Sequence, residues 1–147
     1  MKKKYYRINT IIIGCLATLC VSVCKVKFAE GEESVLLPFR TTENLPDDVV
    51  VEWRREDLNH PVHKYLDGSE QLDQQDPGYE GRTEMKADLL TSGDFSLTLK
   101  EPKVQDHGTY VYHTPPRPAP VLCVLEKIQR NQTNLRLLAS PPHQLYH

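Results

Sequence analysis

The 147-residue sequence predicts an all-β fold, a sandwich of two antiparallel sheets. From Glu30 onward, apolar and polar residues alternate in several short segments, which is the pattern of strands buried on one face. Clusters of Asp, Asn, Gly, Pro and Ser separate these segments and mark turns. No segment has convincing helical periodicity. Several short strands divided by turns favour an all-β sandwich or barrel, and the length fits one domain.

The alternating residues fall in four segments, within which apolar side chains two positions apart share a face. They are Val35, Leu37 and Phe39; Val49, Val51 and Trp53; Phe95, Leu97 and Leu99; and Tyr110 with Tyr112. The turn signals lie at residues 44–47, 67–69, 76–78, 92–94 and 106–108. Residues 129–147 lack the alternation, so we expect a flexible C-terminal tail there, with a glycosylation sequon at Asn131.

The first 24 residues have the order of a secretory signal peptide. Four basic residues lie within the first seven positions, and an apolar segment follows over residues 11–23. This segment is shorter than the ~20 apolar residues that span a bilayer, and it fits the ~7–15-residue core of a signal peptide. We therefore expect a signal peptide helix over residues 1–24, cleaved just before Lys25. A buried helix of the domain and an uncleaved membrane anchor are the alternatives.

Export would leave an acidic chain. Without the four basic residues of the leader, 14 basic residues remain against 20 acidic ones, a net charge of −6. Nucleic-acid binding needs clusters of Lys and Arg against the phosphates, and no basic stripe remains. The sequence therefore excludes nucleic acid as the expected partner.

The cysteines lie mostly at the N-terminus. Cys15, Cys20 and Cys24 are in the leader or at its edge, so Cys123 is the one cysteine placed with certainty in the mature chain. We therefore expect a free thiol at Cys123 and no internal disulfide, unless Cys24 is retained.

Three features in order along the chain point to an immunoglobulin sandwich. Such domains bury a Trp on one strand and carry a Tyr that hydrogen-bonds back to a preceding turn. Trp53 ends a Val-rich strand, and Asp106, Gly108 and Tyr110 have the spacing of the tyrosine corner. Arg82 is placed to pair with Asp106.

The sequence resembles the V-set domain of the butyrophilin and myelin-oligodendrocyte-glycoprotein group, relatives of the T-cell costimulatory ligands. The resemblance covers about residues 26–128 and rests on Glu52-Trp53-Arg54, Val62-His63-Lys64-Tyr65 with Gly68, Tyr79-Glu80-Gly81-Arg82-Thr83, residues 93–99 and Asp106-x-Gly108-x-Tyr110. It implies a domain over residues 25–128, with strands A, B, E and D in one sheet and G, F, C, C′ and C″ in the other. An antigen-receptor variable domain is the weaker match, because residues 121–128 lack the glycines of its strand G bulge.

Two departures concern the disulfide between the sheets. Phe39 and Tyr112 stand where the family has its strand B and strand F cysteines. Losing the bridge costs about 2–5 kcal/mol of stability, and we expect two rings in its place to press on Trp53 at about 1–3 kcal/mol. The residues expected to define the fold are Phe39, Trp53, Arg82, Leu97, Asp106, Gly108, Tyr110 and Tyr112.

The resemblance implies an immune-surface ligand or receptor, secreted or on the external side of the plasma membrane. It would bind a cell-surface protein, a T-cell receptor or counter-receptor, and regulate T-cell receptor signalling and cytokine production. The expected contact is the G-F-C-C′-C″ face, with Glu52, Arg54, Lys64, Tyr65 and Arg117. A soluble decoy, a homophilic adhesion domain that forms a homodimer, and a decayed copy without stable function are the alternatives.

We expect neither catalysis nor a cofactor, a metal or a small-molecule substrate. No pattern in the sequence brings titratable groups together in a pocket. His60 and His63 have the spacing of two metal ligands, but a zinc site needs three or four. The acidic residues near positions 47 and 73–76 are typical of exposed loops.

Overall fold

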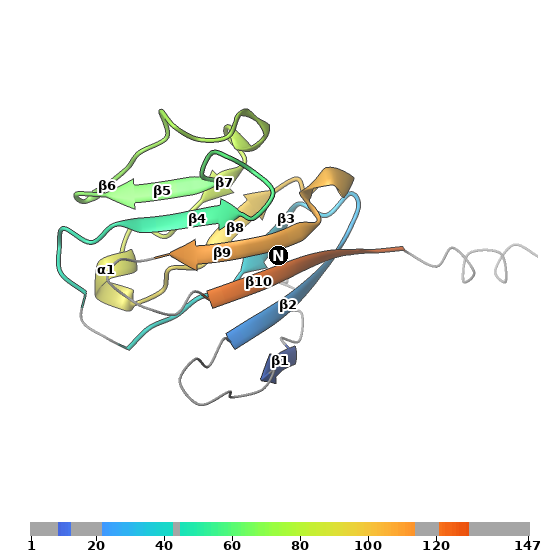
Figure 1. Cartoon of the computed structure of the whole chain (residues 1–147), viewed down its shortest axis with the longest axis horizontal. Coiled ribbons are helices and arrows are strands. Elements are labelled where there is room, and N and C mark those ends of the chain that lie inside the picture. Colours follow the sequence, from blue (N-terminus) through green and yellow to red (C-terminus); the bar gives the residue numbers. More distant parts are fainter. Residues whose placement is uncertain (1–8, 13–21, 43–44, 114–120, 130–147) are drawn as a thin grey trace, which may run out of the picture.

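Two sheets pack face to face in the computed structural model, which describes residues 9–12, 22–42, 45–113 and 121–129 (Figure 1). The larger sheet has the strand order β1-β2-β10-β9-β4-β5-β6 and the smaller one β3-β8-β7. The strands of the larger sheet are β1 (Asn9–Ile12), β2 (Ser22–Ala29), β10 (Val121–Ile128), β9 (Gly108–His113), β4 (Val51–Arg55), β5 (His63–Leu66) and β6 (Ser69–Glu70). Those of the smaller sheet are β3 (Ser34–Leu37), β8 (Leu97–Lys100) and β7 (Thr83–Glu84).

Short helical turns complete the described elements. They are η1 (Pro77–Tyr79), η2 (Val104–Asp106) and the single-turn helix α1 (Leu89–Ser92). Gly93 ends α1 in the left-handed conformation with φ of 68°, which glycine adopts without strain. These turns connect strands, and each contributes one buried residue: Tyr79 from η1, Leu89 from α1 and Asp106 from η2.

The sandwich confirms the predicted fold class, and one strand departs from the expected layout. Strands β10, β9, β4, β5 and β6 take the positions of G, F, C, C′ and C″, and β3, β8 and β7 those of B, E and D. The expected place of strand A beside B is wrong, because β2 lies in the larger sheet and runs parallel to β10. Seven consecutive residue pairs, from Leu122↔Val23 to Ile128↔Ala29, occupy the edge of β10 that would otherwise be unpaired.

The expected leader helix is absent from those of its residues that the structure describes. Asn9–Ile12 forms β1, antiparallel to β2, and Ser22–Cys24 is the beginning of β2. The remaining leader positions, 1–8 and 13–21, lie outside the described residues. Export and cleavage therefore stay predictions.

Aromatic rings fill the place of the family disulfide. Phe39 and Tyr112 stack with ring centroids 3.9 Å apart and an interplanar angle of 27°. Trp53 meets Tyr112 edge-on at 5.5 Å and remains fully buried, with its indole Nε1 donating a hydrogen bond of 3.0 Å to the Phe95 carbonyl. The separation of Trp53 from Tyr112 is ordinary for an aromatic pair, whereas the Phe39–Tyr112 stack is closer than the usual ~4.5–7 Å. Trp53 stays fully buried beside this tight stack.

A hydrogen-bonded corner fixes the start of β9 against η2. The Tyr110 hydroxyl donates to the Asp106 carbonyl at 2.7 Å and lies 2.8 Å from the Tyr79 hydroxyl. Arg82 pairs with the Asp106 carboxylate through two bonds of 2.8 and 2.9 Å. Burial raises the pKa of the Tyr110 hydroxyl, so this group stays protonated and can donate.

Candidate partner-binding face

The outer side of the larger sheet presents a row of partly exposed apolar residues. Alternation along each strand turns one set of side chains to the core and the other outward. The outward residues Val111, Leu122 and Val23 lie opposite one another on β9, β10 and β2, and Arg54 on β4 continues the row. Val124, two positions beyond Leu122, adds to the apolar centre.

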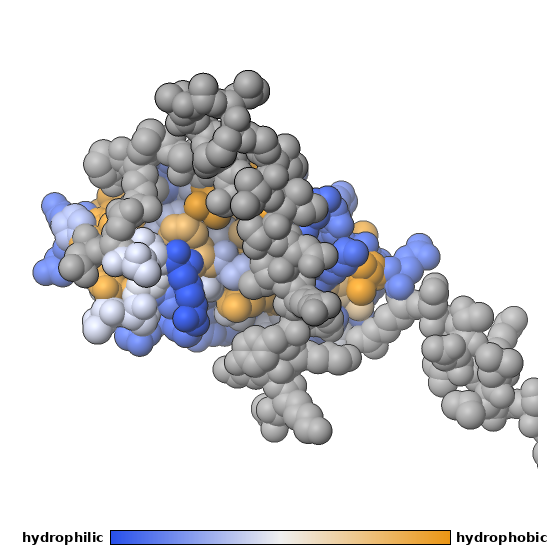
Figure 2. All heavy atoms as spheres, turned by 90° about the horizontal axis from the view of Figure 1, so that it is seen from below, coloured by the Kyte–Doolittle hydropathy of each residue, from blue (hydrophilic) through white to orange (hydrophobic). Residues whose placement is uncertain are grey.

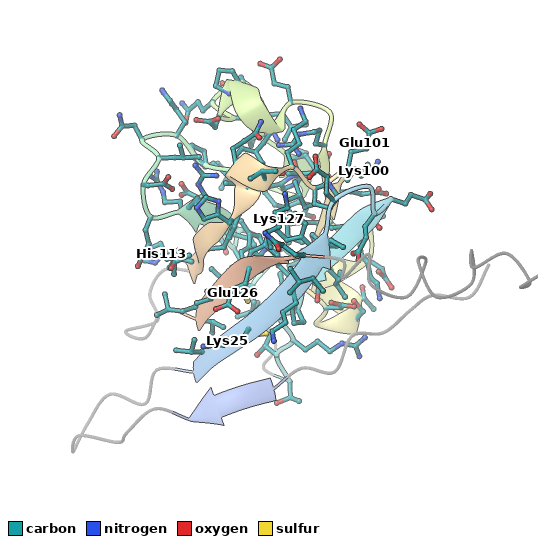
Figure 3. All side chains as sticks on the ribbon, turned by 90° about the vertical axis from the view of Figure 1, so that its right-hand side faces the viewer. Lys25, Lys100, Glu101, His113, Glu126 and Lys127 are labelled. Atoms are coloured by element: carbon teal, nitrogen blue, oxygen red, sulfur yellow. The ribbon has the colours of Figure 1, made fainter. Side chains whose placement is uncertain are left out.

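Charged pairs border this row on both sides. On β4, the Arg54 guanidinium lies 2.5 Å from the Glu52 carboxylate, and Lys64 faces Glu52 from β5. On the other side, Lys25 Nζ on β2 lies 3.9 Å from the Glu126 carboxylate on β10. Both side chains are labelled in Figure 3. We call the six residues on β4, β5, β9 and β10 the outer face: Glu52, Arg54, Lys64, Val111, Leu122 and Val124.

Apolar and charged residues are interspersed on the molecular surface as well. Figure 2 shows orange and blue atoms side by side where one view of the molecule is not covered by grey atoms. Scattered exposed apolar residues are normal on any protein. Here, however, cross-strand register makes Val111 and Leu122 of the outer face contiguous with each other and with Val23 on the neighbouring strand β2.

The structure brings together three of the five predicted contact residues. Glu52, Arg54 and Lys64 lie on the outer face. Tyr65 does not, and its inclusion was wrong: it alternates with Lys64, points to the core and is 9% exposed. Arg117 lies outside the described residues, as does the glycosylation sequon at Asn131.

Sequence reasoning missed the apolar centre of the face. Val111 lies between the buried Tyr110 and Tyr112, and Leu122 and Val124 flank the buried Cys123. The period-two pattern that identified the core side of these strands also identifies the outward side. The signal was therefore present in the alternation itself.

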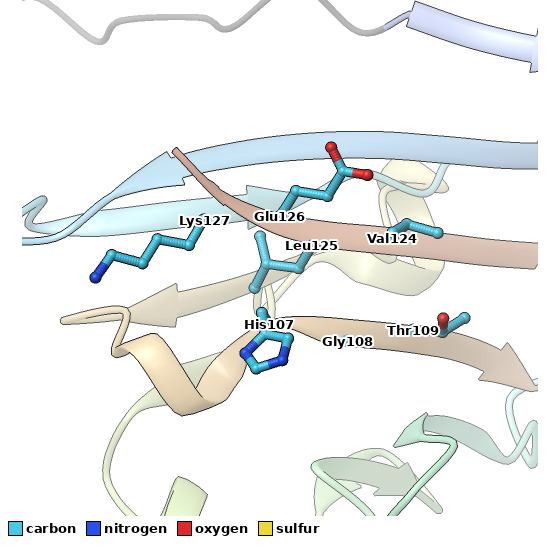
Figure 4. A pocket seen from close by; sticks show the side chains of 7 residues that line it. All are labelled: His107, Gly108, Thr109, Val124, Leu125, Glu126 and Lys127. Atoms are coloured by element: carbon cyan, nitrogen blue, oxygen red, sulfur yellow. The ribbon is translucent and has the colours of Figure 1, made fainter. Parts of the chain in front are cut away.

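A shallow depression of about 480 Å³ lies over the ends of β9 and β10 (Figure 4). Its charged side chains do not converge, since Figure 4 shows Glu126 and Lys127 pointing away from each other. Glu126 pairs with Lys25, and Lys127 Nζ lies 2.8 Å from the Glu30 carboxylate. The depression therefore brings no acid and base together for chemistry.

Among the described residues, no three His, Cys, Asp or Glu side chains are grouped so as to hold a metal ion. His63 instead links strands: its Nδ1 lies 2.9 Å from the Thr83 hydroxyl and its Nε2 3.3 Å from the Glu70 carboxylate. Burial lowers the pKa of His63, although Glu70 opposes the shift. Within the same part of the chain, no helix has the length and apolar character to cross a bilayer.

Several curated proteins are similar in sequence. Human V-set domain-containing T-cell activation inhibitor 1 is 34% identical over 80 residues, covering 54% of this chain and 28% of that protein. Mouse butyrophilin-like protein 2 is 34% identical over 84 residues, covering 54% of this chain and 18% of that protein. Human myelin-oligodendrocyte glycoprotein is 33% identical over 60 residues, with 41% and 24% covered. The matches thus span 18% to 28% of the length of these relatives, which are named as V-set and related proteins and not as enzymes.

Solved structures share the fold. The human B7-H4 IgV-like domain superposes with a TM-score of 0.58 at 24% identity, over 82% of this chain and 96% of that one. A chain from the crystal structure of ICOS in complex with ICOS-L and an anti ICOS-L VNAR domain gives a TM-score of 0.64 at 22% identity, over 73% and 55%. No protein-family model matches the chain. The strand order, the tyrosine corner and these relatives agree: the chain carries an immunoglobulin V-set domain related to the B7 and butyrophilin group.

Proposed function

We propose that this chain is an immune-surface ligand or receptor that binds a T-cell surface protein through the outer face. The observation that carries the proposal is the contiguous row of Val111 and Leu122, bordered by the charges of Glu52, Arg54 and Lys64. Protein interfaces have this composition, an apolar centre within a polar rim. In this reading the protein acts outside the cell, secreted or on the external side of the plasma membrane.

A rigid sheet suits this role physically. Backbone hydrogen bonds on both sides fix β4, β9 and β10, so little conformational entropy remains to be lost on binding. The Arg54–Glu52 ion pair leaves Arg54 half exposed and able to meet an acidic partner residue. Charges at the rim raise association rates and discriminate between partners more than they add affinity.

The relatives support a role in T-cell regulation. One is named for inhibiting T-cell activation, and one structure of the same fold comes from a complex of ICOS with ICOS-L. By this likeness, binding would alter signalling by the T-cell receptor and change cytokine production. Fold alone does not carry such a function, so the proposal depends on the outer face as well.

A T-cell stimulation assay tests the proposal. Purified protein is coated with a stimulating antibody to the T-cell receptor complex, and secreted cytokine is measured. We expect the protein to raise or lower cytokine output, and Leu122→Glu to abolish the effect by placing a charge in the apolar row. Leu36→Glu, on the smaller sheet where Leu36 is 46% exposed, is the matched control and should keep it. Cytokine output unaffected by the folded protein, or equally affected by both variants, would contradict the proposal.

A further inference from the structure

Two buried cysteines lie directly opposite each other on adjacent strands. Cys24 on β2 is the register partner of Cys123 on β10. Both are free in the structure, and they are 8% and 0% exposed, so both side chains point to the core. Neighbouring strands lie about 4.7–4.9 Å apart, within the ~4.4–6.8 Å between Cα atoms that a disulfide spans.

We propose that Cys24 and Cys123 form a disulfide in the exported protein, joining β2 to β10 within the larger sheet. This bridge differs from that of the family, which joins the two sheets and whose place Phe39 and Tyr112 occupy. It would fasten β2, which becomes the edge strand once the leader with β1 is removed, and it would close a loop that contains nearly the whole domain. Long loops restrict the unfolded chain most.

The bond forms by exchange with a small-molecule disulfide such as oxidised glutathione. The Cys24 thiolate attacks the oxidant, forms a mixed disulfide and releases one glutathione thiolate. Cys123 then loses its proton to that thiolate, attacks the Cys24 sulfur and releases the second glutathione. Two protein thiols are oxidised by two electrons while one disulfide is reduced to two thiols.

The environment of the pair favours this order of attack. The proximity of Cys123 lowers the pKa of Cys24, although burial opposes the shift. The Cys123 thiol donates to the Pro38 carbonyl at 3.8 Å. The proximity of Cys24, together with burial, raises the pKa of Cys123. Cys24 is also the more exposed of the two thiols, at 8% against 0%, so an oxidant reaches it first and Cys123 then resolves the mixed disulfide.

The bridge requires that cleavage leaves Cys24 on the mature chain. Cleavage before Lys25 would remove it, but small residues at Cys20 and Ser22 also match the signal for cleavage before Val23. The pairing of β2 with β10 begins at Val23, so that site preserves the whole ladder. It also gives Cys123 a partner, as exported domains usually provide.

Disulfide mapping of the secreted full-length product tests the proposal. The chain is expressed with its leader in secretory cells, treated with an alkylating agent and digested with trypsin without reduction. We expect a mature chain beginning at Val23, lighter than its reduced form by two hydrogen atoms. A peptide ending at Lys25 should be linked to the peptide covering residues 104–127. A mature chain beginning at Lys25, alkylated Cys24 and Cys123, or a link from Cys24 to Cys15 or Cys20 would overturn the proposal.

Melting with and without reductant gives a second readout. Reductant should lower the melting temperature of the wild-type protein. It should not change the melting temperatures of Cys24→Ser and Cys123→Ser. An equal melting temperature for the wild-type protein in both conditions would reject the bridge. Because the mapping uses the unaltered chain, it decides the question even where a variant fails to fold.

Discussion

At the residue scale, buried polar contacts hold together the end of the sandwich where η2 leads into β9. Asp106 accepts two bonds from Arg82 and one of 2.7 Å from the Lys103 backbone N–H, while its carbonyl accepts from Tyr110. The side chains of Arg82 and Asp106 are 12% and 2% exposed. Removing one partner would leave the other charge buried and unpaired, which is the costly case for an ion pair.

We predict that Arg82→Ala destabilises the domain by about 3–5 kcal/mol, because Asp106 loses its counter-charge while remaining buried. The control is Arg40→Ala, which removes an exposed partner of Asp94 and should cost no more than about 1 kcal/mol. Urea unfolding of both variants measures the difference. Equal losses of stability would show that the buried Arg82–Asp106 pair stabilises the domain no more than the exposed Arg40–Asp94 pair does.

The stacked rings of Phe39 and Tyr112 give a second prediction. Placing cysteines at both positions, Phe39→Cys with Tyr112→Cys, should form the bridge between the sheets. It should raise the free energy of unfolding by about 2–4 kcal/mol, because the bridge restricts the unfolded chain. Either single change should gain nothing, because one thiol closes no loop. Thiol counting and thermal melting under oxidising conditions measure the outcome. Unpaired thiols at both positions 39 and 112 in a folded double variant would mean that these positions do not face each other.

At the element scale, alternation correctly predicted which side of each strand is buried. It did not predict which neighbouring strand each one pairs with. Period two places Trp53 and Tyr110 on core sides, and the structure buries both completely. Alternation does not specify which edge a strand joins, so the position of β2 beside β10 could not be read from its residues. The prediction that Tyr65 lies on the outer face was wrong for another reason: adjacent residues of a strand point to opposite faces, and Lys64 occupies the outward position of β5.

The link between β5, β6 and β7 predicts a dependence on pH. Burial lowers the pKa of His63 in the folded state, so the unfolded chain binds a proton at a higher pH than the folded one. Stability contributed by the neutral ring is therefore complete above the ordinary pKa of about 6.5 and declines as pH falls below it. We expect the melting temperature to fall between about pH 7.5 and pH 5.5.

The melting temperature of His63→Gln should fall less than that of the wild-type protein over this pH range, since glutamine does not titrate. His60→Gln, at an exposed position, is the control and should follow the wild-type protein. Identical pH profiles for His63→Gln and the wild-type protein would show that the buried ring does not govern acid stability.

At the scale of the whole molecule, the two sheets differ in what they offer a partner. The larger sheet presents the apolar row with ion pairs beside it, whereas β7 and β8 of the smaller sheet carry the exposed pair Glu84–Lys100 at 3.0 Å. The fold and the charged part of the outer face were predictable from the sequence. Its apolar centre emerged once the register of β9 against β10 was known.

Staining of activated T cells by fluorescent multimers of the protein tests the role of the outer face most directly. Arg54→Glu and Lys64→Glu reverse charges at the rim, and Lys100→Glu makes the same change on the smaller sheet. We predict that the first two abolish staining while their melting curves stay unchanged, and that Lys100→Glu stains like the wild-type protein. If Arg54→Glu and Lys64→Glu still stained the cells and Lys100→Glu did not, the binding site would lie on the smaller sheet.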